Sequence, residues 1–243
     1  MIYTESVKIP LKDINEDLTI TDRGILELFE NVSSHHSDMV GYGVVGRESN
    51  GFTWILADWN VKVIKRPKYG DELWVNTWAR YINGTLKKAY TYRDFEILDE
   101  NGEACVIATS KWVIINTETR RIVHIDDNIM SAYEMEKKCV FEEQELEKLK
   151  EPSEFEYESE YVVKRSDVDF VDHVHNLYYI DLAYNAMPQN VYNLRPFNEF
   201  RISYKKEIKL GDKIKCKYAY DNEKHIVCLY DEQDKLHSIV MLK

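Results

Sequence analysis

Apolar residues recur every three to five positions near the start of the chain, which predicts a helix. The stripe consists of Ile20, Ile25, Leu28, Phe29 and Val32. This spacing places the five side chains on one face of a helix. Thr21 is suited to cap the helix, and Asp22 would lie in its electropositive first turn. Gly41 and Gly43 mark the exit from the helix.

Alternation with a period of two replaces the helical spacing between residues 51 and 116, and it predicts β-strands. Trp59, Val61 and Val63 alternate with polar residues, and residues 73–81 are rich in aromatic and β-branched side chains. Asn83-Gly84 predicts a two-residue hairpin turn of type I′. We therefore expect the first half to be one helix followed by a four-stranded antiparallel meander.

The second half repeats this order of elements. Alternation resumes at residues 157–163, a second helix is expected between Asn176 as its cap and Pro188, and four strands follow, at 200–208, 213–220, 225–230 and 236–242. Residues 67–73 also match residues 208–214 through a shared Gly-Asp turn, at an offset of 141 positions. These repeats predict tandem copies of one α+β module, each with an antiparallel sheet wrapped around one helix.

The expected domains are an N-terminal module at 1–125, an acidic linker at 126–154 and a C-terminal module at 155–243. Residues 131–150 are rich in Glu, Lys, Leu and Met and are followed by Pro152. That composition predicts an exposed helical linker.

Charge, apolar length and cysteine pattern exclude several classes of protein. The 243 residues carry a formal net charge of −11, and an acidic chain binds nucleic acid poorly. No apolar stretch reaches the roughly 20 residues that cross a bilayer, and the first ten residues do not form a secretory signal. Four cysteines without a C-x-x-C pattern predict reduced thiols, with a Cys216–Cys228 bridge left open. We expect a cytoplasmic protein without nucleic-acid binding or membrane insertion.

Polar residues gather just ahead of the second expected helix. They are Arg165, Asp167, Asp169, Asp172, His173, His175 and Asn176. A polar loop that caps a helix is one explanation. A metal site is another, because Asp and His are hard or borderline ligands, although the spacing matches no firm metal motif.

A catalytic site is the third explanation. Backbone N–H groups at the start of the helix could polarise a carbonyl group or hold an oxyanion. Asp169 could act as a base, as a nucleophile or in orienting water, and His173 has the side chain that most often transfers protons in catalysis. The chain contains no Gly-x-Ser-x-Gly segment, which argues against an α/β-hydrolase.

Residues 167–179, DVDFVDHVHNLYY, resemble the D-x-D-x-N-x-H-V-N-N-x-x-Y segment of acyl-ACP thioesterases. These enzymes are double hotdog hydrolases related to the plant enzymes that end fatty-acid synthesis. The similarity extends along nearly the whole chain. In the first module it includes Tyr69-Gly70-Asp71, Asn76-Thr77-Trp78, Arg93-Asp94-Phe95, residues 108–112 and Thr119-Arg120-Arg121. In the second module, Tyr204-Lys205-Lys206-Glu207 is similar to the family's Y-R-R-E segment.

The resemblance implies an α+β tandem (double) hotdog fold and hydrolysis of fatty acyl-ACP thioesters without a cofactor or metal. Asp169, His173 and Glu207 become the catalytic candidates. The backbone N–H groups of Val174 and His175 would polarise the thioester carbonyl. Asp172 or Asn176 would be the supporting residue that compensates for a catalytic Asn of the family, which falls on Val171 here.

Two positions depart from the family pattern. Val171 stands where the family has a catalytic Asn, and Ile208 stands where the plant members have a Cys. The second change argues against thiolate attack. The first leaves two possibilities, altered chemistry or weakened activity, and it motivates a non-catalytic acyl-binding or regulatory protein as an alternative function. The alternative enzyme is a thioesterase that acts on acyl-CoA.

The implied partner is acyl carrier protein with a phosphopantetheine-linked acyl chain. Because that partner is acidic, we expect basic docking residues. Two clusters qualify, Lys62, Lys65, Arg66 and Lys68 in the first module and Arg201, Lys205, Lys206 and Lys209 in the second. Either cluster could instead be a solvated strand edge. The duplication is expected to give a monomer or homodimer.

By analogy with the family, the first module would form the acyl pocket. Its aromatic residues could line a channel or be ordinary core residues. They are Trp54, Trp59, Trp74 and Trp78.

Overall fold

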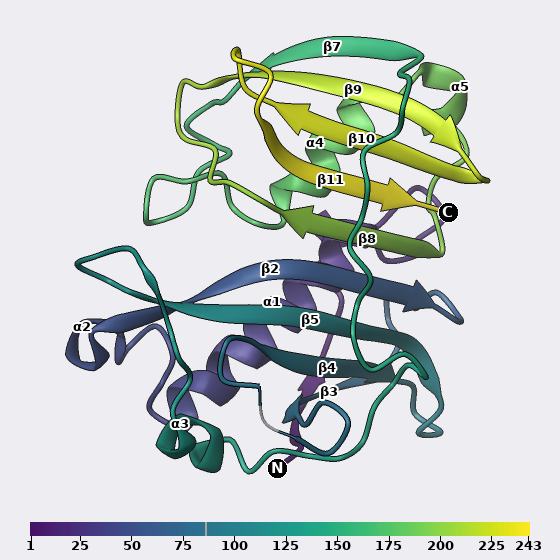
Figure 1. Cartoon of the computed structure of the whole chain (residues 1–243). Coiled ribbons are helices and arrows are strands. Elements are labelled where there is room, and N and C mark those ends of the chain that lie inside the picture. The colour runs from purple at the N-terminus through teal and green to yellow at the C-terminus, as the bar shows by residue number, and fades with distance from the viewer. Residues whose placement is uncertain (86) are drawn as a thin grey trace. The chain divides into compact units, whose positions relative to one another are not determined.

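The computed structural model describes residues 1–85 and 87–243, which form two compact units, Met1–Leu146 and Glu147–Lys243. Each unit has an antiparallel sheet with a helix against one face (Figure 1). Within the part of the chain that the structure describes, no helix is long and apolar enough to cross a membrane.

Unit 1 contains a sheet with the strand order β1-β3-β4-β5-β2, with the short β6 beside β5. Its strands are β1 (Tyr3–Val7), β2 (Phe52–Val63), β3 (Leu73–Arg80), β4 (Thr91–Leu98), β5 (Ala104–Asn116) and β6 (Ile122–Val123). Its helical segments are η1 (Leu11–Asp13), α1 (Asp22–Met39), α2 (Arg47–Asn50) and α3 (Asp127–Ala132).

The expected meander is wrong in one respect, because β2 pairs with β5 and not with β3. The segment between β2 and β3 does not form a hairpin turn. Instead its backbone bonds to the chain ahead of α1, where Ile20 N donates to Pro67 O (2.9 Å) and Tyr69 N donates to Leu18 O (2.9 Å). The type I′ turn is confirmed, since Asn83 and Gly84 both have positive φ values, 48° and 71°.

Helix α1 is the first expected helix, and its start and buried face are confirmed. The Thr21 hydroxyl oxygen accepts a hydrogen bond from Gly24 N (3.0 Å), as an N-cap side chain does. Phe29 on α1 packs against Trp59 of β2 and Phe95 of β4, with ring centroids 6.0 and 4.8 Å away. This aromatic group forms the centre of the unit 1 core.

His36, in the last turn of α1, lies fully buried in unit 1. Its ring stacks on Tyr3, and its Nδ1 lies 2.9 Å from Arg93 Nη1. Burial, followed by the Arg93 charge, lowers the pKa of His36 from 6.5 to about 3. The imidazole is therefore neutral in the folded protein at neutral pH.

We expect this histidine to make the protein acid-sensitive. Between about pH 3 and 6.5 the unfolded chain binds a proton at His36 that the folded chain does not. Stability therefore falls by up to about 1.4 kcal/mol per pH unit as the pH drops through this window. Urea unfolding at pH 7, 6 and 5 measures the slope, which His36→Gln should reduce and His35→Gln, at the exposed neighbour, should not. An equal slope in both variants contradicts the prediction.

Unit 2 contains a sheet with the strand order β8-β11-β10-β9-β7. Its strands are β7 (Tyr157–Val162), β8 (Glu199–Tyr204), β9 (Lys213–Asp221), β10 (Lys224–Tyr230) and β11 (Leu236–Leu242). Its helices are α4 (Tyr178–Ala186) and α5 (Gln189–Tyr192). All five predicted strands are confirmed, although β8 ends at residue 204 instead of 208.

The structure excludes the disulfide that the sequence left open. Cys228 pairs with Lys217 in the β9–β10 ladder, and the adjacent residue Leu229 pairs with Cys216. Because neighbouring residues of a strand point to opposite faces, the two thiols lie on opposite sides of the sheet. Burial raises the pKa of each thiol to about 12.

The prediction of a helical linker is wrong for most of its length. Only α3 is helical within residues 126–154, and residues 133–156 lack helix. Side chains of β3 and β4 form hydrogen bonds with backbone groups of this segment that would otherwise bond within a helix. Trp78 Nε1 donates to Lys138 O (2.9 Å), and Val140 N donates to Asp94 Oδ2 (3.0 Å). These tertiary bonds override the helix propensity of the segment.

Candidate active site

The polar segment ahead of α4 forms a tight hairpin in unit 2, which we call the site hairpin (residues 168–174). Val168 and Val174 pair as an antiparallel bridge, and Asp169 N donates to His173 O (2.9 Å). Asp172 lies at the tip with a φ of 60°. Aspartate adopts this left-handed conformation more readily than most residues.

The site hairpin is bonded to the segment that follows β8. His173 and Lys209 form an antiparallel bridge, and Val174 N donates to Ile208 O (2.8 Å). This pairing brings His173 Nε2 to 2.9 Å from Glu207 Oε2. Their side chains are 23% and 41% exposed, so the pair remains within reach of solvent. Two of the three predicted catalytic residues thus lie in direct contact.

The third candidate, Asp169, has one carboxylate oxygen engaged within the site hairpin. Its Oδ1 accepts hydrogen bonds from Val171 N (2.9 Å) and His173 N (3.3 Å). Val171 therefore contributes through its backbone, although its side chain cannot form the hydrogen bond of the family's Asn. Among the described residues, no hydrogen bond or ion pair joins the Asp169 carboxylate to the side chains of His173 or Glu207.

Tyr179, in the first turn of α4, is a site residue that the residue-by-residue reasoning missed. Burial raises the pKa of its hydroxyl well above the usual range. The nearby carboxylates of Glu207 and Asp169 add to this shift, and a hydrogen bond from the Ile208 N–H opposes it. A neutral hydroxyl therefore lies close to both candidate carboxylates. The signal was available in sequence, because the family-like segment ends at Tyr179.

The predicted role of the Val174 and His175 N–H groups is wrong. Val174 N donates to Ile208 O, and His175 N donates to Asp167 O (2.9 Å), so both groups are engaged within the fold. Among the described residues, neither Asn176 N nor Leu177 N donates a hydrogen bond. These two N–H groups therefore remain available at the start of α4.

The supporting residues also differ from expectation. Helix α4 begins two residues after Asn176, and no side chain caps it. Instead the carbonyl of Asn176 accepts a hydrogen bond from the Tyr204 hydroxyl (2.8 Å). The Asp172 side chain is exposed at the tip of the site hairpin. Its carboxylate makes no hydrogen bond or ion pair with His173 or Glu207, both of which the structure describes.

The metal explanation relied on the Asp and His residues of this segment. Asp169 Oδ1 accepts backbone N–H groups, and His173 Nε2 faces Glu207. In the described ranges, no group of three or more His, Cys, Asp or Glu side chains is placed to hold a metal ion.

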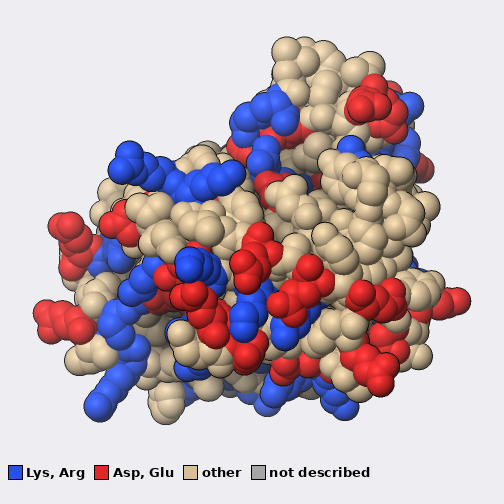
Figure 2. All heavy atoms as spheres, turned by 90° about the horizontal axis from the view of Figure 1, so that it is seen from above, with Lys and Arg blue, Asp and Glu red and all other residues tan. Residues whose placement is uncertain are grey.

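The basic residues expected to dock a carrier protein differ in their exposure. Arg66 is wrong as a docking residue, because its side chain is only 8% exposed and forms an ion pair with Asp22 (2.8 Å). Lys65 pairs with Asp99 (3.0 Å). Figure 2 shows Lys and Arg side chains interspersed with Asp and Glu on the face it displays. The other docking residues stay predictions, namely Lys62, Lys65, Lys68, Arg201, Lys205, Lys206 and Lys209.

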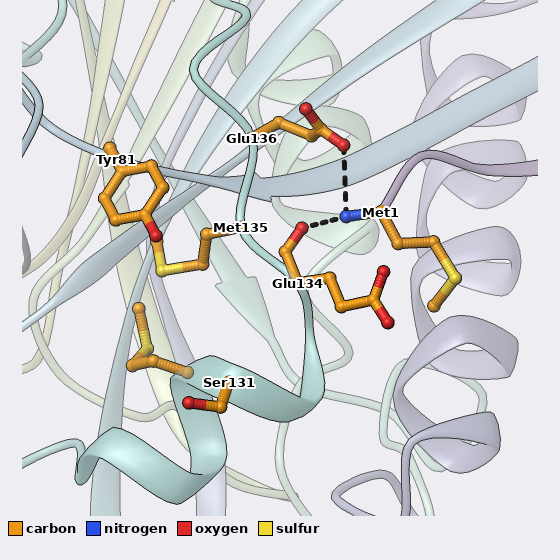
Figure 3. Close-up of a pocket in the computed structure, with 7 residues that line it drawn as sticks. Met1, Tyr81, Ser131, Glu134, Met135 and Glu136 are labelled. Atoms are coloured by element: carbon orange, nitrogen blue, oxygen red, sulfur yellow. Dashed lines mark hydrogen bonds and ion pairs between the residues drawn. The ribbon is translucent and has the colours of Figure 1, made fainter.

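The acyl pocket in unit 1 also stays a prediction. Trp59 and Trp78 are fully buried core residues, as the alternative explanation held. A surface pocket of about 450 Å³ in this unit is lined by none of the four tryptophans. Figure 3 shows its lining, which includes Met1, Tyr81, Ser131, Glu134, Met135 and Glu136.

Each unit packs an antiparallel sheet on a helix, and this repeat defines a tandem hotdog protein. The His173–Glu207 pair, in the unit that contains α4, provides a candidate site for hydrolysis. Comparison with family models specifies the class further. The model of the acyl-ACP thioesterase N-terminal domain matches residues 1–133, and that of the C-terminal domain matches residues 149–239. The chain belongs to the acyl-ACP thioesterase family.

Individual relatives agree with this assignment. Oleoyl-acyl carrier protein thioesterase 1, chloroplastic, of Arabidopsis thaliana is 25% identical over 226 residues, which cover 86% of this chain and 61% of the relative. Palmitoyl-acyl carrier protein thioesterase, chloroplastic, of Cuphea hookeriana is 25% identical over 219 residues, with coverage of 85% and 52%. The chain therefore spans about half to three fifths of the length of these relatives.

Solved structures confirm the double hotdog fold. The acyl-ACP thioesterase from Bacteroides thetaiotaomicron VPI-5482 is similar with a TM-score of 0.82 and 19% identity, covering 99% of this chain and 96% of that one. The 12:0-ACP thioesterase from Umbellularia californica gives a TM-score of 0.86 and 18% identity, with coverage of 100% and 96%.

Proposed function

We propose that this protein hydrolyses fatty acyl thioesters carried on acyl carrier protein, releasing free fatty acid and the holo carrier. The observation that carries the proposal is the 2.9 Å contact between His173 and Glu207, within the C-terminal domain of a chain that belongs to the acyl-ACP thioesterase family. The names of the relatives support the same chemistry. The proposal includes a cytoplasmic location and a monomer or homodimer.

The reaction proceeds by attack of water on the thioester carbonyl carbon. The His173–Glu207 pair accepts a proton from the water as the C–O bond forms, and Asp169 orients the water with its second carboxylate oxygen. The tetrahedral intermediate then expels the phosphopantetheine thiolate, which takes the proton back from the pair. Ile208 stands where the plant members have a Cys, so no thiolate attack at that position enters this mechanism.

Carbonyl polarisation belongs to the start of α4 in this mechanism. The N–H groups of Asn176 and Leu177 have no acceptor among the described residues. They also lie at the positive end of the helix dipole. Such donors stabilise the oxyanion of the tetrahedral intermediate.

Parallel measurement of thiol release from acyl-ACP and acyl-CoA substrates tests the proposal and separates the alternatives. We expect release from acyl-ACP that exceeds release from the matching acyl-CoA and is unchanged by EDTA. Faster release from acyl-CoA would identify an acyl-CoA thioesterase. Binding of acyl-ACP without release would identify the non-catalytic protein that Val171 leaves open.

A further inference from the structure

Asp167 lies at the base of the site hairpin, outside the proposed catalytic group, and it is almost fully buried, with 7% exposure. Its Oδ2 accepts hydrogen bonds from the Tyr161 hydroxyl (2.7 Å) and from Lys164 N (2.7 Å). Its Oδ1 accepts a hydrogen bond from the Ser166 hydroxyl (3.0 Å). These three donors bind both oxygens of the buried carboxylate, so its role is to hold the surrounding chain in place.

The main chain of Asp167 binds the opposite end of the same hairpin. Its carbonyl accepts the His175 N–H (2.9 Å). The carboxylate therefore holds the entry to the site hairpin at residues 164–166, and the carbonyl holds the exit at residue 175. That exit leads directly to Asn176, whose N–H group serves the proposed carbonyl polarisation.

Tyr161 connects this arrangement to the sheet. It lies in β7, where it pairs with Ile214 of β9. Its hydroxyl thus joins a fixed strand position to the Asp167 carboxylate. Burial alone would raise the pKa of Asp167, but the hydrogen bonds from Tyr161, Lys164 N and Ser166 outweigh it and lower the pKa below the usual range. The carboxylate is therefore ionised at neutral pH, where its hydrogen bonds are strongest.

We infer that Asp167 and Tyr161 are positioning residues for the active site: together they fix the site hairpin to β7 so that His173 meets Glu207. This inference rests on the proposed function. Among the described residues, no hydrogen bond or ion pair joins either side chain to the His173–Glu207 pair, so both act through the hairpin backbone. Catalytic groups that are displaced by about 1 Å lose on the order of 10²-fold in rate.

The variants Asp167→Asn and Tyr161→Phe test the inference. We expect kcat for acyl-ACP hydrolysis to fall by about 10- to 100-fold in Asp167→Asn, with KM changed less than about threefold. The asparagine amide of this variant faces Lys164 N and the Tyr161 hydroxyl either with its NH₂ group, which cannot accept their hydrogen bonds, or with a neutral oxygen, which accepts them more weakly than a carboxylate does. Tyr161→Phe should lower kcat less, and the double variant should be no slower than Asp167→Asn, because Tyr161 acts through Asp167.

Asp99→Asn is the matched control. Asp99, in unit 1, also uses its carboxylate to accept two backbone N–H groups, from Asn101 (3.0 Å) and Glu103 (3.1 Å), and one side-chain donor, Lys65 (3.0 Å). We expect this variant to lose thermal stability without loss of kcat. Unchanged kcat in Asp167→Asn, or an equal loss of kcat in Asp99→Asn, overturns the inference.

Amide hydrogen exchange separates this inference from the proposed function. In Asp167→Asn we expect the Asp169 and His175 amides to lose about tenfold or more of their protection, while amides of β10 and β11 keep theirs. Unchanged protection in the site hairpin overturns the inference whatever the activity of the wild type. If the wild type releases no thiol from any acyl thioester but the exchange result holds, the proposed function fails and the role of Asp167 and Tyr161 in holding the hairpin stands.

Discussion

Replacement of Glu207 by glutamine should lower kcat for acyl-ACP hydrolysis by about 10²- to 10⁴-fold, the range of a lost general acid–base group. Glutamine keeps the shape of the side chain and can still form a hydrogen bond with His173. It cannot accept the proton of the attacking water. Because glutamine can keep the contact with His173, the shape of the site is preserved. We therefore expect KM to change much less than kcat. Steady-state thiol release measures both parameters.

Two further variants make this test specific. Asp169→Asn should also lower kcat, since the amide orients water less well than the carboxylate. Glu158→Gln, at an exposed position of β7 whose carboxylate pairs with Lys217, should leave turnover unchanged. Turnover near that of the wild type in both Glu207→Gln and Asp169→Asn would contradict the catalytic assignments.

Replacement of Asp94 by alanine should cost about 3–5 kcal/mol of unfolding free energy. Arg80 Nε lies 2.8 Å from Asp94 Oδ1, and each side chain is only 1% exposed. Asp94 also accepts hydrogen bonds from Thr109 Oγ1 (2.6 Å) and Val140 N (3.0 Å). The substitution leaves the buried Arg80 charge without its carboxylate, which is the main source of the cost.

Urea unfolding of Asp94→Ala measures this effect, with Glu96→Ala as the matched control on the same strand. Glu96 pairs with Lys138 (2.7 Å), whose side chain is 45% exposed, and a pair of this kind contributes about 1 kcal/mol or less. A loss of stability in Asp94→Ala that is no greater than in Glu96→Ala would show that the buried pair is not a major source of stability.

Local patterns in the sequence were sufficient for α1, α4 and most of the strands, but not for β1, for the linker or for all of the strand pairings. The stripe from Ile20 to Val32 and the cap at Thr21 describe α1 correctly, because helical spacing and capping act within a few residues. The position of β2 beside β5 rests on a ladder between residues 52–63 and 106–116, and the chain that leads to β3 bonds to residues 18–20. Such long-range bonds leave no periodic signal.

The candidate site shows the same division. The family resemblance identifies His173 and Glu207 as catalytic candidates, because each residue lies in a segment that is similar to a family motif. Their contact agrees with that expectation. Whether the Val174 N–H group is free to bind a ligand depends on the register between the site hairpin and residues 208–209, and the His175 N–H group is bound by the carbonyl of Asp167. Side-chain identity does not specify that register, so the two donors that it leaves available, at Asn176 and Leu177, could not be found from the sequence.

The extended segment after α3 determines where this chain can be recombined with its relatives. Backbone groups of Lys138 and Val140 are bound by Trp78 and Asp94, and Leu146 N donates to the Tyr92 hydroxyl (2.9 Å). A junction at residue 125 would join these side chains to a foreign segment. A chimaera that exchanges residues 1–146 as one piece keeps every one of these bonds within a single parent.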